Sequence, residues 1–352
     1  MWAEDVITRS ANRGCALELS VENAGAYLRS RGIAAVRVKE LGGGVSNTVL
    51  LIETETETGR ESLVLKQSLP QLRVKDEWMA DRSRIWREMQ GIVDAATFFP
   101  AGSVPTVLWT DPSNYLFAMS AVAGQSWKEQ IFNGVLDSQV AHQTGGLLGL
   151  LISSTWKNAS YHTKYGDQTA FDQLRIDPYY RSIARRHPDL ADRVAELIAE
   201  SSGRRLALVH GDFSPKNVLV MGDGLTLIDF EVVHFGDPSF DAAFCLNHLI
   251  LKWFCLPSRR PALRELMTAF WSGLFGTLPS DACSFFESAT LRHLGCLMLA
   301  RVDGKSPVEY LTRKDLQEQV RAVARRLIVR PPAAFAELMS RIDDVSSGRF
   351  TL

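Results

Sequence analysis

The sequence predicts an α+β protein of two lobes, a small one built on an antiparallel sheet and a larger helical one. Short apolar or alternating runs separated by glycines fill the first third of the chain, as expected for strands and hairpins. From about residue 126 onward, apolar residues recur mostly at helical spacing. The 352 residues, 46% of them hydrophobic, can bury two cores. We therefore expect an N-lobe at 1–122 and a C-lobe at 123–352.

The first lobe is expected to begin with a helix over 16–32, ended by Gly32, because glycine favours the position after a helix C-terminus. A second helix is expected over 76–96, where large apolar residues recur about every third or fourth position. The strands of this lobe are predicted at 36–41, 47–55, 63–68, 104–111 and 115–124.

In the second lobe, helices are predicted at 136–153, 188–200, 242–254, 261–275, 281–300 and 313–328. One stretch departs from this helical pattern. Between residues 206 and 229, three short β-rich runs, "LALVH", "NVLVM" and "LTLID", are separated by "GDFSPK" and "GDG". The polar residues of this stretch are therefore expected on loops at the ends of strands.

Amino-acid composition indicates which classes of partner the protein is expected to bind. The chain has 39 Lys and Arg against 40 Asp and Glu, so no net field attracts nucleic acid or an anionic membrane. Its five cysteines show no CxxC spacing, which argues against a zinc site or a disulfide framework. The first residues lack the apolar core of a secretory signal. We expect a cytoplasmic protein whose partner is a small molecule.

Three oxygen-bearing side chains stand out in the irregular stretch. Asp212 precedes Asn217 by five positions, and Asp229 follows at the end of the next hairpin. Each alone could be an ordinary turn or cap residue. Together they offer the hard oxygen ligands that Mg²⁺ prefers when substrate phosphates complete its shell. The carboxylate that is not needed for the metal, Asp212, would accept a proton from a hydroxyl that attacks a γ-phosphoryl group.

The motifs "HGDFSPKN" and "LIDFE" resemble the catalytic and metal-binding loops of the aminoglycoside phosphotransferase and choline kinase superfamily, distant relatives of protein kinases. In this superfamily glycine, here Gly211, stands where protein kinases have the arginine of H-R-D. The resemblance implies a bilobal protein-kinase-like fold. It also implies an ATP-dependent phosphotransferase whose acceptor is an alcohol group of a small molecule similar to an aminoglycoside, choline, methylthioribose or homoserine.

The resemblance assigns roles to individual residues. It makes Asp212 the catalytic base, and Asn217 and Asp229 the magnesium ligands. Glu231 resembles the second acid of the D-x-E arrangement in choline and methylthioribose kinases and is expected at the metal. Two residues are expected to support the loop, His210 as a buried structural histidine and Asp241 as an acceptor of backbone hydrogen bonds.

The remaining expected residues would bind the nucleotide. Lys66 resembles the strand lysine that holds the phosphates, with Glu88 as its ion-pair partner; the plainer alternatives are a lysine at a sheet edge and a solvated helix residue. Lys216 is a candidate to neutralise the transferred group. Contacts with phosphate are expected from Gly43, Gly44, Ser46 and Asn47, and contacts with adenine from the backbone of Met119 and Ala121. ATP is expected, with GTP left open.

Two other functions and the nature of the acceptor stay open. A pseudokinase that binds nucleotide as a regulatory module is the alternative, but it would have no use for the base. A true protein kinase is disfavoured, because eleven residues between Asp229 and Asp241 leave no room for an activation loop. Acceptor determinants are expected at 150–185 and 245–305. Acidic residues in the first segment could attract a cationic acceptor or form a solvated face: Asp167, Asp172 and Asp177.

Overall fold

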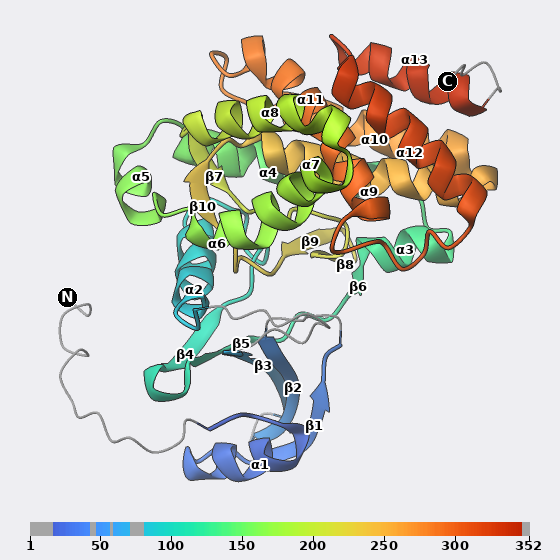
Figure 1. Ribbon diagram of the computed structural model, residues 1–352. Helices are drawn as coiled ribbons and strands as arrows, with labels where there is room; N and C mark the ends of the chain where they lie inside the picture. Colours follow the sequence, from blue (N-terminus) through green and yellow to red (C-terminus); the bar gives the residue numbers. More distant parts are fainter. Residues whose placement is uncertain (1–16, 43–46, 57–58, 71–80, 347–352) are drawn as a thin grey trace. The chain divides into compact units, whose positions relative to one another are not determined.

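The computed structural model describes residues 17–42, 47–56, 59–70 and 81–346 (Figure 1). The chain divides into two compact units, one of residues 1–85 with 108–121 and the other of residues 86–107 with 122–352. The first holds an antiparallel sheet, and the second is mainly helical. The predicted fold class is therefore confirmed. No helix in the described ranges is long and apolar enough to cross a membrane.

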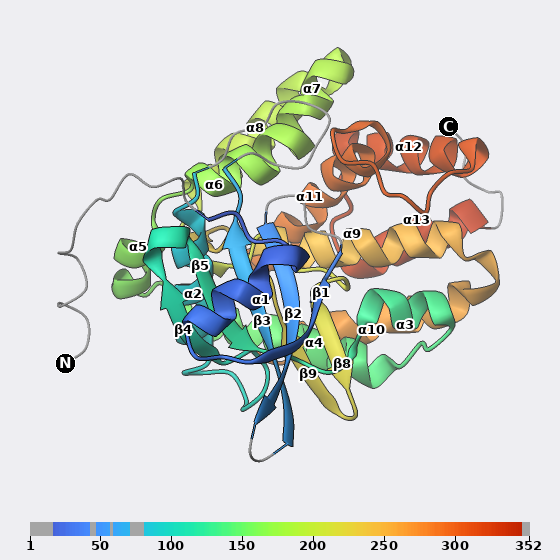
Figure 2. The same cartoon turned by 90° about the horizontal axis from the view of Figure 1, so that it is seen from below.

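The first unit contains a five-stranded sheet in the order β1-β2-β3-β5-β4. Its elements are α1 (Val21–Ser30), β1 (Ala35–Glu40), β2 (Asn47–Thr56), β3 (Gly59–Ser68), β4 (Val107–Asp111), the 3₁₀ turn η1 (Pro112–Asn114) and β5 (Leu116–Ser120). Helix α1 lies across the sheet, as Figure 2 shows. The helix begins later than predicted because Ser20 caps it, with the backbone N–H of Ser20 donating to Oδ1 of Asn23 at 2.9 Å.

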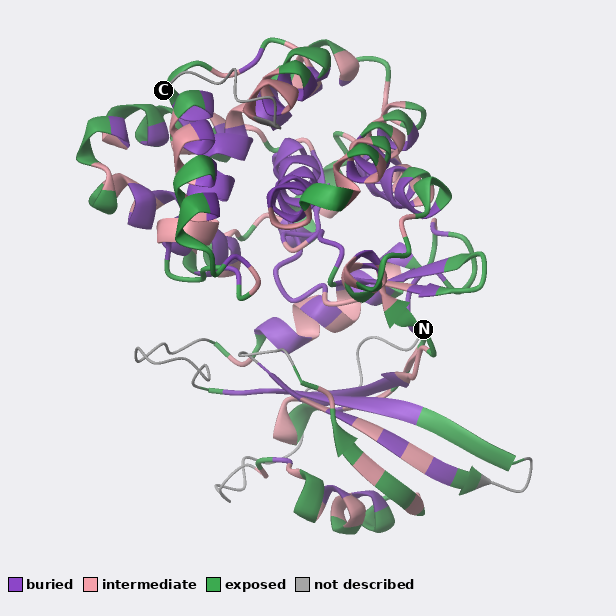
Figure 3. Ribbon diagram, turned by 90° about the vertical axis from the view of Figure 1, so that its right-hand side faces the viewer, coloured by how far each residue is buried: buried purple, intermediate pink, exposed green. Residues whose placement is uncertain are grey.

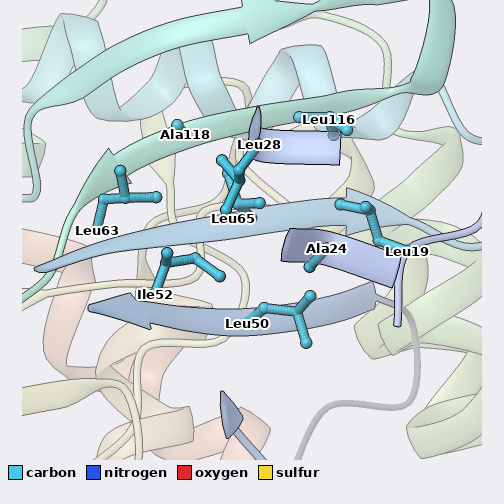
Figure 4. Close-up of a cluster of buried hydrophobic side chains, with 9 residues drawn as sticks. All are labelled: Leu19, Ala24, Leu28, Leu50, Ile52, Leu63, Leu65, Leu116 and Ala118. Atoms are coloured by element: carbon cyan, nitrogen blue, oxygen red, sulfur yellow. The ribbon is translucent and has the colours of Figure 1, made fainter. Parts of the chain in front are cut away.

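The core of this unit lies between α1 and one face of the sheet (Figure 4). Side chains at every second position of the strands point to this core. On β3 these are Leu63 and Leu65, which pack with residues from the other elements: Leu19, Ala24, Leu28, Leu50, Ile52, Leu116 and Ala118. Because side chains alternate along a strand, Lys66 lies on the opposite face of the sheet.

The second unit contains the remaining helices. They are α2 (Arg84–Ala95), α3 (Trp127–Asn133), α4 (Ser138–Thr155), α5 (Ala159–Tyr165), α6 (Thr169–Phe171), the π-helix η2 (Asp172–Arg181), α7 (Ser182–Arg186), η3 (Pro188–Leu190), α8 (Ala191–Gly203), α9 (Ser239–Cys255), η4 (Pro257–Arg259), α10 (Arg260–Phe275), α11 (Cys283–Asp303), α12 (Lys314–Val329) and α13 (Phe335–Ser346). The six helices predicted in this lobe are confirmed, whereas α3, α5, η2 and α13 were not predicted.

Two small sheets carry the irregular stretch of the sequence. One pairs β7 (Ala207–Val209) with β10 (His234–Gly236), and the other has the order β6-β8-β9. Its strands are β6 (Gln125–Ser126), β8 (Val218–Met221) and β9 (Gly224–Leu227). The three β-rich runs of the sequence are therefore strands, with the polar residues on the loops between them. Helix α9 is buried from Ser239 to Phe254, and buried segments are purple in Figure 3.

Helix α2 differs from the sequence-based expectation in extent and in assignment. It begins at Arg84 because the Asp81 carboxylate accepts the backbone N–H of Ser83 at 2.8 Å and forms a turn there. The first five residues of the predicted helix, 76–80, lie outside the described residues, and residues 81–83 precede the helix. Residues 86–107, which we expected in the N-lobe, belong to the second unit. Within that unit the Asp94 carboxylate of α2 accepts the hydroxyl of Tyr165 on α5 at 2.6 Å.

Helices α4 and α10 pack closely because glycines face each other across the contact. A Cβ added at Gly145 would lie 2.0 Å from the carbonyl oxygen of Phe270, and one at Gly273 would lie 2.0 Å from that of His142. Both clashes are with backbone atoms, which cannot move aside cheaply. By contrast, Gly146, the next residue of α4, has open space at its Cβ position.

We expect Gly145→Ala to destabilise the protein by roughly 1–3 kcal/mol, because the added methyl group forces α4 and α10 apart. The control Gly146→Ala should be neutral or stabilise by up to about 1 kcal/mol, since alanine favours helix. Urea unfolding of the two variants measures the difference. Equal stabilities would contradict the close packing of these helices.

Candidate active site

The loop between β7 and β8 is fixed by one buried carboxylate. Oδ2 of Asp241, in the first turn of α9, accepts the backbone N–H of His210 at 2.6 Å, and Oδ1 accepts that of Gly211 at 2.9 Å. Burial raises the pKa of Asp241 to about 7, against the opposing effect of these two N–H groups. Helix α9 thus sets the position of the loop that carries Asp212.

His210 connects this loop to the segment that carries Asp229. The imidazole is buried, its Nδ1 accepts the backbone N–H of Asp212 at 3.2 Å, and its Nε2 donates to the carbonyl of Ile228 at 3.1 Å. These two bonds require the neutral ring with its proton on Nε2. Burial lowers the pKa of His210 to about 4, so the ring stays neutral near pH 7. The geometry gives His210 a structural role.

Gly211 is required at its position for two reasons. Its φ of +79° lies in the left-handed region, and a Cβ there would lie 2.9 Å from the carbonyl oxygen of Val232. A larger residue, such as the arginine of H-R-D, would be strained and would clash with the backbone. The glycine of the motif is therefore a consequence of how closely this loop approaches residue 232.

The Asp212 carboxylate is held by nitrogen atoms from three directions. Nδ2 of Asn217 donates to Oδ2 of Asp212 at 2.9 Å, and also to its backbone carbonyl at 2.9 Å. Nη2 of Arg175 lies 3.3 Å from Oδ1, and Nζ of the exposed Lys216 lies 3.8 Å from Oδ2. Such a carboxylate can accept a proton from a hydroxyl group.

Arg175 is the residue of this site that sequence reasoning missed. It is buried in the π-helix η2, and its Nε donates to the carbonyl of Gly211 at 2.5 Å. Burial acts to lower the pKa of Arg175, but the charges of Asp212, Glu231 and other neighbours raise it overall. The available signal was Pro178 inside a helical pattern, since proline removes a helix hydrogen bond and π-helical turns gather at functional sites.

The predicted metal ligands fit a magnesium ion through their donor atoms. Because the amide nitrogen of Asn217 is engaged with Asp212, its Oδ1 is turned away from that carboxylate. The backbone N–H of Ile228 donates to the carbonyl of Asn217 at 3.0 Å, which places Asp229 one residue beyond this contact. Asp229 has a φ of 72°, a strained conformation for a non-glycine residue and one that gathers at functional sites.

Glu231 is buried, and its charge contributes to the raised pKa of both Arg175 and Lys216. For Lys216 the largest contribution comes from Asp212. Within the described ranges no three His, Cys, Asp or Glu side chains cluster closely enough to hold a metal by themselves. An amide oxygen and two carboxylates would leave coordination positions for substrate phosphates, as magnesium sites commonly do.

The residues predicted to bind nucleotide are divided between the two units. Lys66 lies on β3 of the first unit, paired with Val49 and Phe117 in the sheet, and Glu88 lies on α2 in the second. Both side chains are buried. Their ion pair stays a prediction. Asn47 is the first residue of β2, whereas Gly43, Gly44 and Ser46 lie outside the described residues.

The predicted adenine contacts lie at the end of β5. Met119 pairs with Val64 of β3, and the backbone N–H of Ala121 donates to the carbonyl of Ser62 at 3.3 Å. This N–H is therefore engaged with β3. The adenine contacts themselves stay a prediction.

Each of the acidic residues considered for a cationic acceptor has a cation of this chain beside it. Asp167 binds Arg87 at 2.7 Å, and Asp172 forms a two-pronged pair with Arg181 at 2.7 and 2.8 Å. The third, Asp177, pairs with Arg185 at 3.2 Å and Lys305 at 2.7 Å. These pairs favour the alternative of a solvated, internally neutralised face.

Because His210 is buried as a neutral ring, we expect the stability of the protein to depend on pH in the acidic range. Its pKa is about 4 in the folded protein and near 6.5 in the unfolded chain, so the unfolded chain binds more protons between these values. The free energy of unfolding should therefore fall as pH drops from 6.5 towards 4, by up to about 1.4 kcal/mol per pH unit from this residue. Urea unfolding across this range should give a shallower slope for His210→Gln, while the control at an exposed histidine, His142→Gln, keeps the parent slope.

Comparison with known proteins identifies the family. The model of the phosphotransferase enzyme family matches residues 37–271, about two thirds of the chain. A methylthioribose kinase of Pectobacterium carotovorum subsp. carotovorum is 28% identical over 251 residues, 63% of this chain and 62% of the relative. Methylthioribose kinase 2 of Oryza sativa subsp. japonica is 25% identical over 255 residues, 62% of this chain and 57% of the relative. The matches thus span about six tenths of the length of these relatives.

Solved structures share the fold. The amicoumacin kinase hAmiN in complex with AMP-PNP, Ca²⁺ and Ami has a TM-score of 0.55 at 17% identity, with 89% of this chain and 96% of that chain covered. An ethanolamine kinase of Plasmodium vivax has a TM-score of 0.52 at 11% identity, with 82% and 81% covered. The chain therefore belongs to the phosphotransferase enzyme family.

Proposed function

We propose that this protein transfers the γ-phosphoryl group of ATP to a hydroxyl group of a small molecule, with Asp212 as the base. The observation that carries the proposal is the fixed Asp212 carboxylate. It is partly exposed, and Arg175 and Asn217 hold its two oxygens. A carboxylate held in this way can orient an acceptor hydroxyl and take its proton.

The chain's own residues would act mainly by positioning and by charge. Asn217 through Oδ1, Asp229 and Glu231 would hold magnesium, which when bound neutralises charge on the nucleotide phosphates. Lys66, with Glu88 as its expected partner, would hold the phosphates, and Lys216 would lie beside the transferred group. Phosphoryl transfer needs aligned oxygens and neutralised charge more than covalent chemistry, so this set of residues suffices.

The relatives support the same reaction class. Four of the curated proteins that match are named methylthioribose kinases, and two neighbours in fold are named for amicoumacin and ethanolamine. All of these names describe kinases of small molecules. The alternative of a pseudokinase is disfavoured, because a module that only binds nucleotide would not need a base held by two cations.

We expect Asp212→Asn to lower kcat by roughly 10²–10⁴-fold, because the amide cannot accept the hydroxyl proton. Nucleotide binding should be retained, since Asp212 is not among the proposed metal ligands. The matched control is Asp223→Asn, an exposed aspartate in the β8–β9 turn, which should leave kcat unchanged. A coupled assay for ADP release measures turnover of Mg-ATP with a panel of hydroxyl compounds and with water alone.

Two results would overturn the proposal. An Asp212→Asn variant as active as the parent would exclude Asp212 as the base. Tight Mg-dependent binding of ATP without transfer to any panel compound, and without slow hydrolysis, would favour the pseudokinase.

A further inference from the structure

Lys252 is a buried lysine on α9 that forms no ion pair with a carboxylate of the described residues. It is 1% exposed, and its Nζ donates to the carbonyl of His248 at 3.2 Å. The same Nζ lies 5.3 Å from the ring centre of Tyr310 and 5.8 Å from that of Phe132. Two aromatic faces and one carbonyl compensate a buried ammonium only in part.

The electrostatic cost of burying the Lys252 ammonium lowers its pKa. Burial and then the charge of Lys128 lower the pKa of Lys252 to about 7, far below the value of an exposed lysine. A methionine would fill the same space without this cost. Retaining a cation where an apolar residue would be more stable is typical of a binding site.

Other cations surround Lys252. Nζ of Lys128 lies 5.9 Å from the centre of the same Tyr310 ring, and the Arg301 guanidinium donates to the Tyr179 hydroxyl at 2.9 Å. Burial, followed by the charges of Arg301, Lys252, Lys216 and Lys128, lowers the pKa of His248. Contacts place these groups together: Nζ of Lys252 donates to the carbonyl of His248. The ring of Tyr179, which Arg301 contacts, lies 5.7 Å from that of Phe244, a neighbour of His248. We name the following set the basic cluster: Lys128, His248, Lys252 and Arg301.

Two polar atoms, one in the basic cluster and one beside it, are buried without a hydrogen-bond partner in the described part of the chain. They are the hydroxyl of Tyr310 and Nε of Arg301. A buried donor without an acceptor destabilises the folded protein. Both atoms can donate, so an oxygen anion would satisfy them together with Lys252. Among the described residues, the carboxylate that pairs with the cluster is that of Glu309, a largely exposed residue that binds Lys128.

The basic cluster adjoins the Asp212 loop. The ring centre of His248 lies 5.1 Å from that of Phe244, one turn earlier on α9, and the Arg175 guanidinium lies 5.8 Å from the Phe244 ring. Arg175 in turn contacts Asp212. From the other side, the backbone N–H of Lys128 donates to the carbonyl of Pro215 in the loop at 2.8 Å.

We propose that the basic cluster binds an anionic group of the acceptor, a carboxylate or a phosphate, while the acceptor's hydroxyl lies at Asp212. The proposal rests on the proposed function and adds the charge class of the substrate. The anion takes the place of the Glu309 carboxylate on Lys128 and gives Lys252 a counter-ion. Because a nearby anion favours the charged lysine, binding at pH 7.5 takes up a proton.

The test compares neutral compounds with their anionic counterparts: glycerol with glycerate, glucose with gluconate, and ribose with ribose 5-phosphate. Binding is measured by calorimetry with saturating Mg-AMP-PNP, which occupies the nucleotide site, in two buffers of different ionisation enthalpy to count protons. At least one anionic compound should bind about tenfold more tightly than its neutral counterpart and take up protons. The carboxylate and phosphate pairs distinguish the two anions.

Three variants localise the effect. Lys252→Met should remove the preference for the anion and the proton uptake, and its melting temperature should be unchanged or higher, because an unpaired buried charge is lost. Glu309→Gln should strengthen anion binding by removing the competing carboxylate. The control Lys305→Gln removes a lysine that pairs with Asp177 and should change neither property.

The proposal is wrong if no anionic compound binds more tightly than its neutral counterpart, or if Lys252→Met keeps the preference. An anion preference that depends on Lys252, without phosphorylation of any compound, would instead leave the anion site standing and count against the proposed function. Phosphorylation of neutral compounds without an anion preference would support the proposed function and count against the anion site.

Discussion

Two backbone N–H groups of one loop donate hydrogen bonds to the buried Asp241 carboxylate. These bonds fix the loop on which the whole site depends. A loop that binds a helix through its main chain cannot shift without leaving a buried acceptor unsatisfied, which is costly. Asp241 lies on α9, and residues one, two and three turns further along the same face include His248 and Lys252. One helix therefore positions both the candidate base and the cations that adjoin it.

Charge balance explains why so many ionisable groups tolerate burial here. Arg175 is buried beside Asp212, and its charge also interacts with Glu231 and Asp229. A buried cation among several carboxylates is stable only while the carboxylates are present, and the converse also holds. Within the second unit, carboxylates therefore gather at the Asp212 loop and cations gather around Lys252. This separation of charge is expected where a metal and an anion bind at different points.

Membership of the family explains the residues of the Asp212 loop better than it explains which acceptor is bound. The relatives and neighbours in fold are named for methylthioribose, amicoumacin and ethanolamine, which differ in charge and shape. A base, a metal site and a phosphate clamp serve any hydroxyl, because they act on the group being transferred. Acceptor choice must come from side chains beyond these, and the proposed basic cluster is the candidate in this chain.

The sequence by itself determined the fold class, most helices, the three strands around the loop and the residue types at Asp212, Asn217 and Asp229, because periodicity and short motifs are local. Contacts distant along the chain needed the tertiary structure. Arg175 reaches Asp212 from a π-helix whose irregular hydrogen bonding no periodicity predicts. Likewise the helical pattern over 242–254 does not show that Lys252 is buried beside two aromatic rings, with no carboxylate partner among the described residues. Burial depends on what the rest of the chain places around a residue, and a linear pattern does not contain that information.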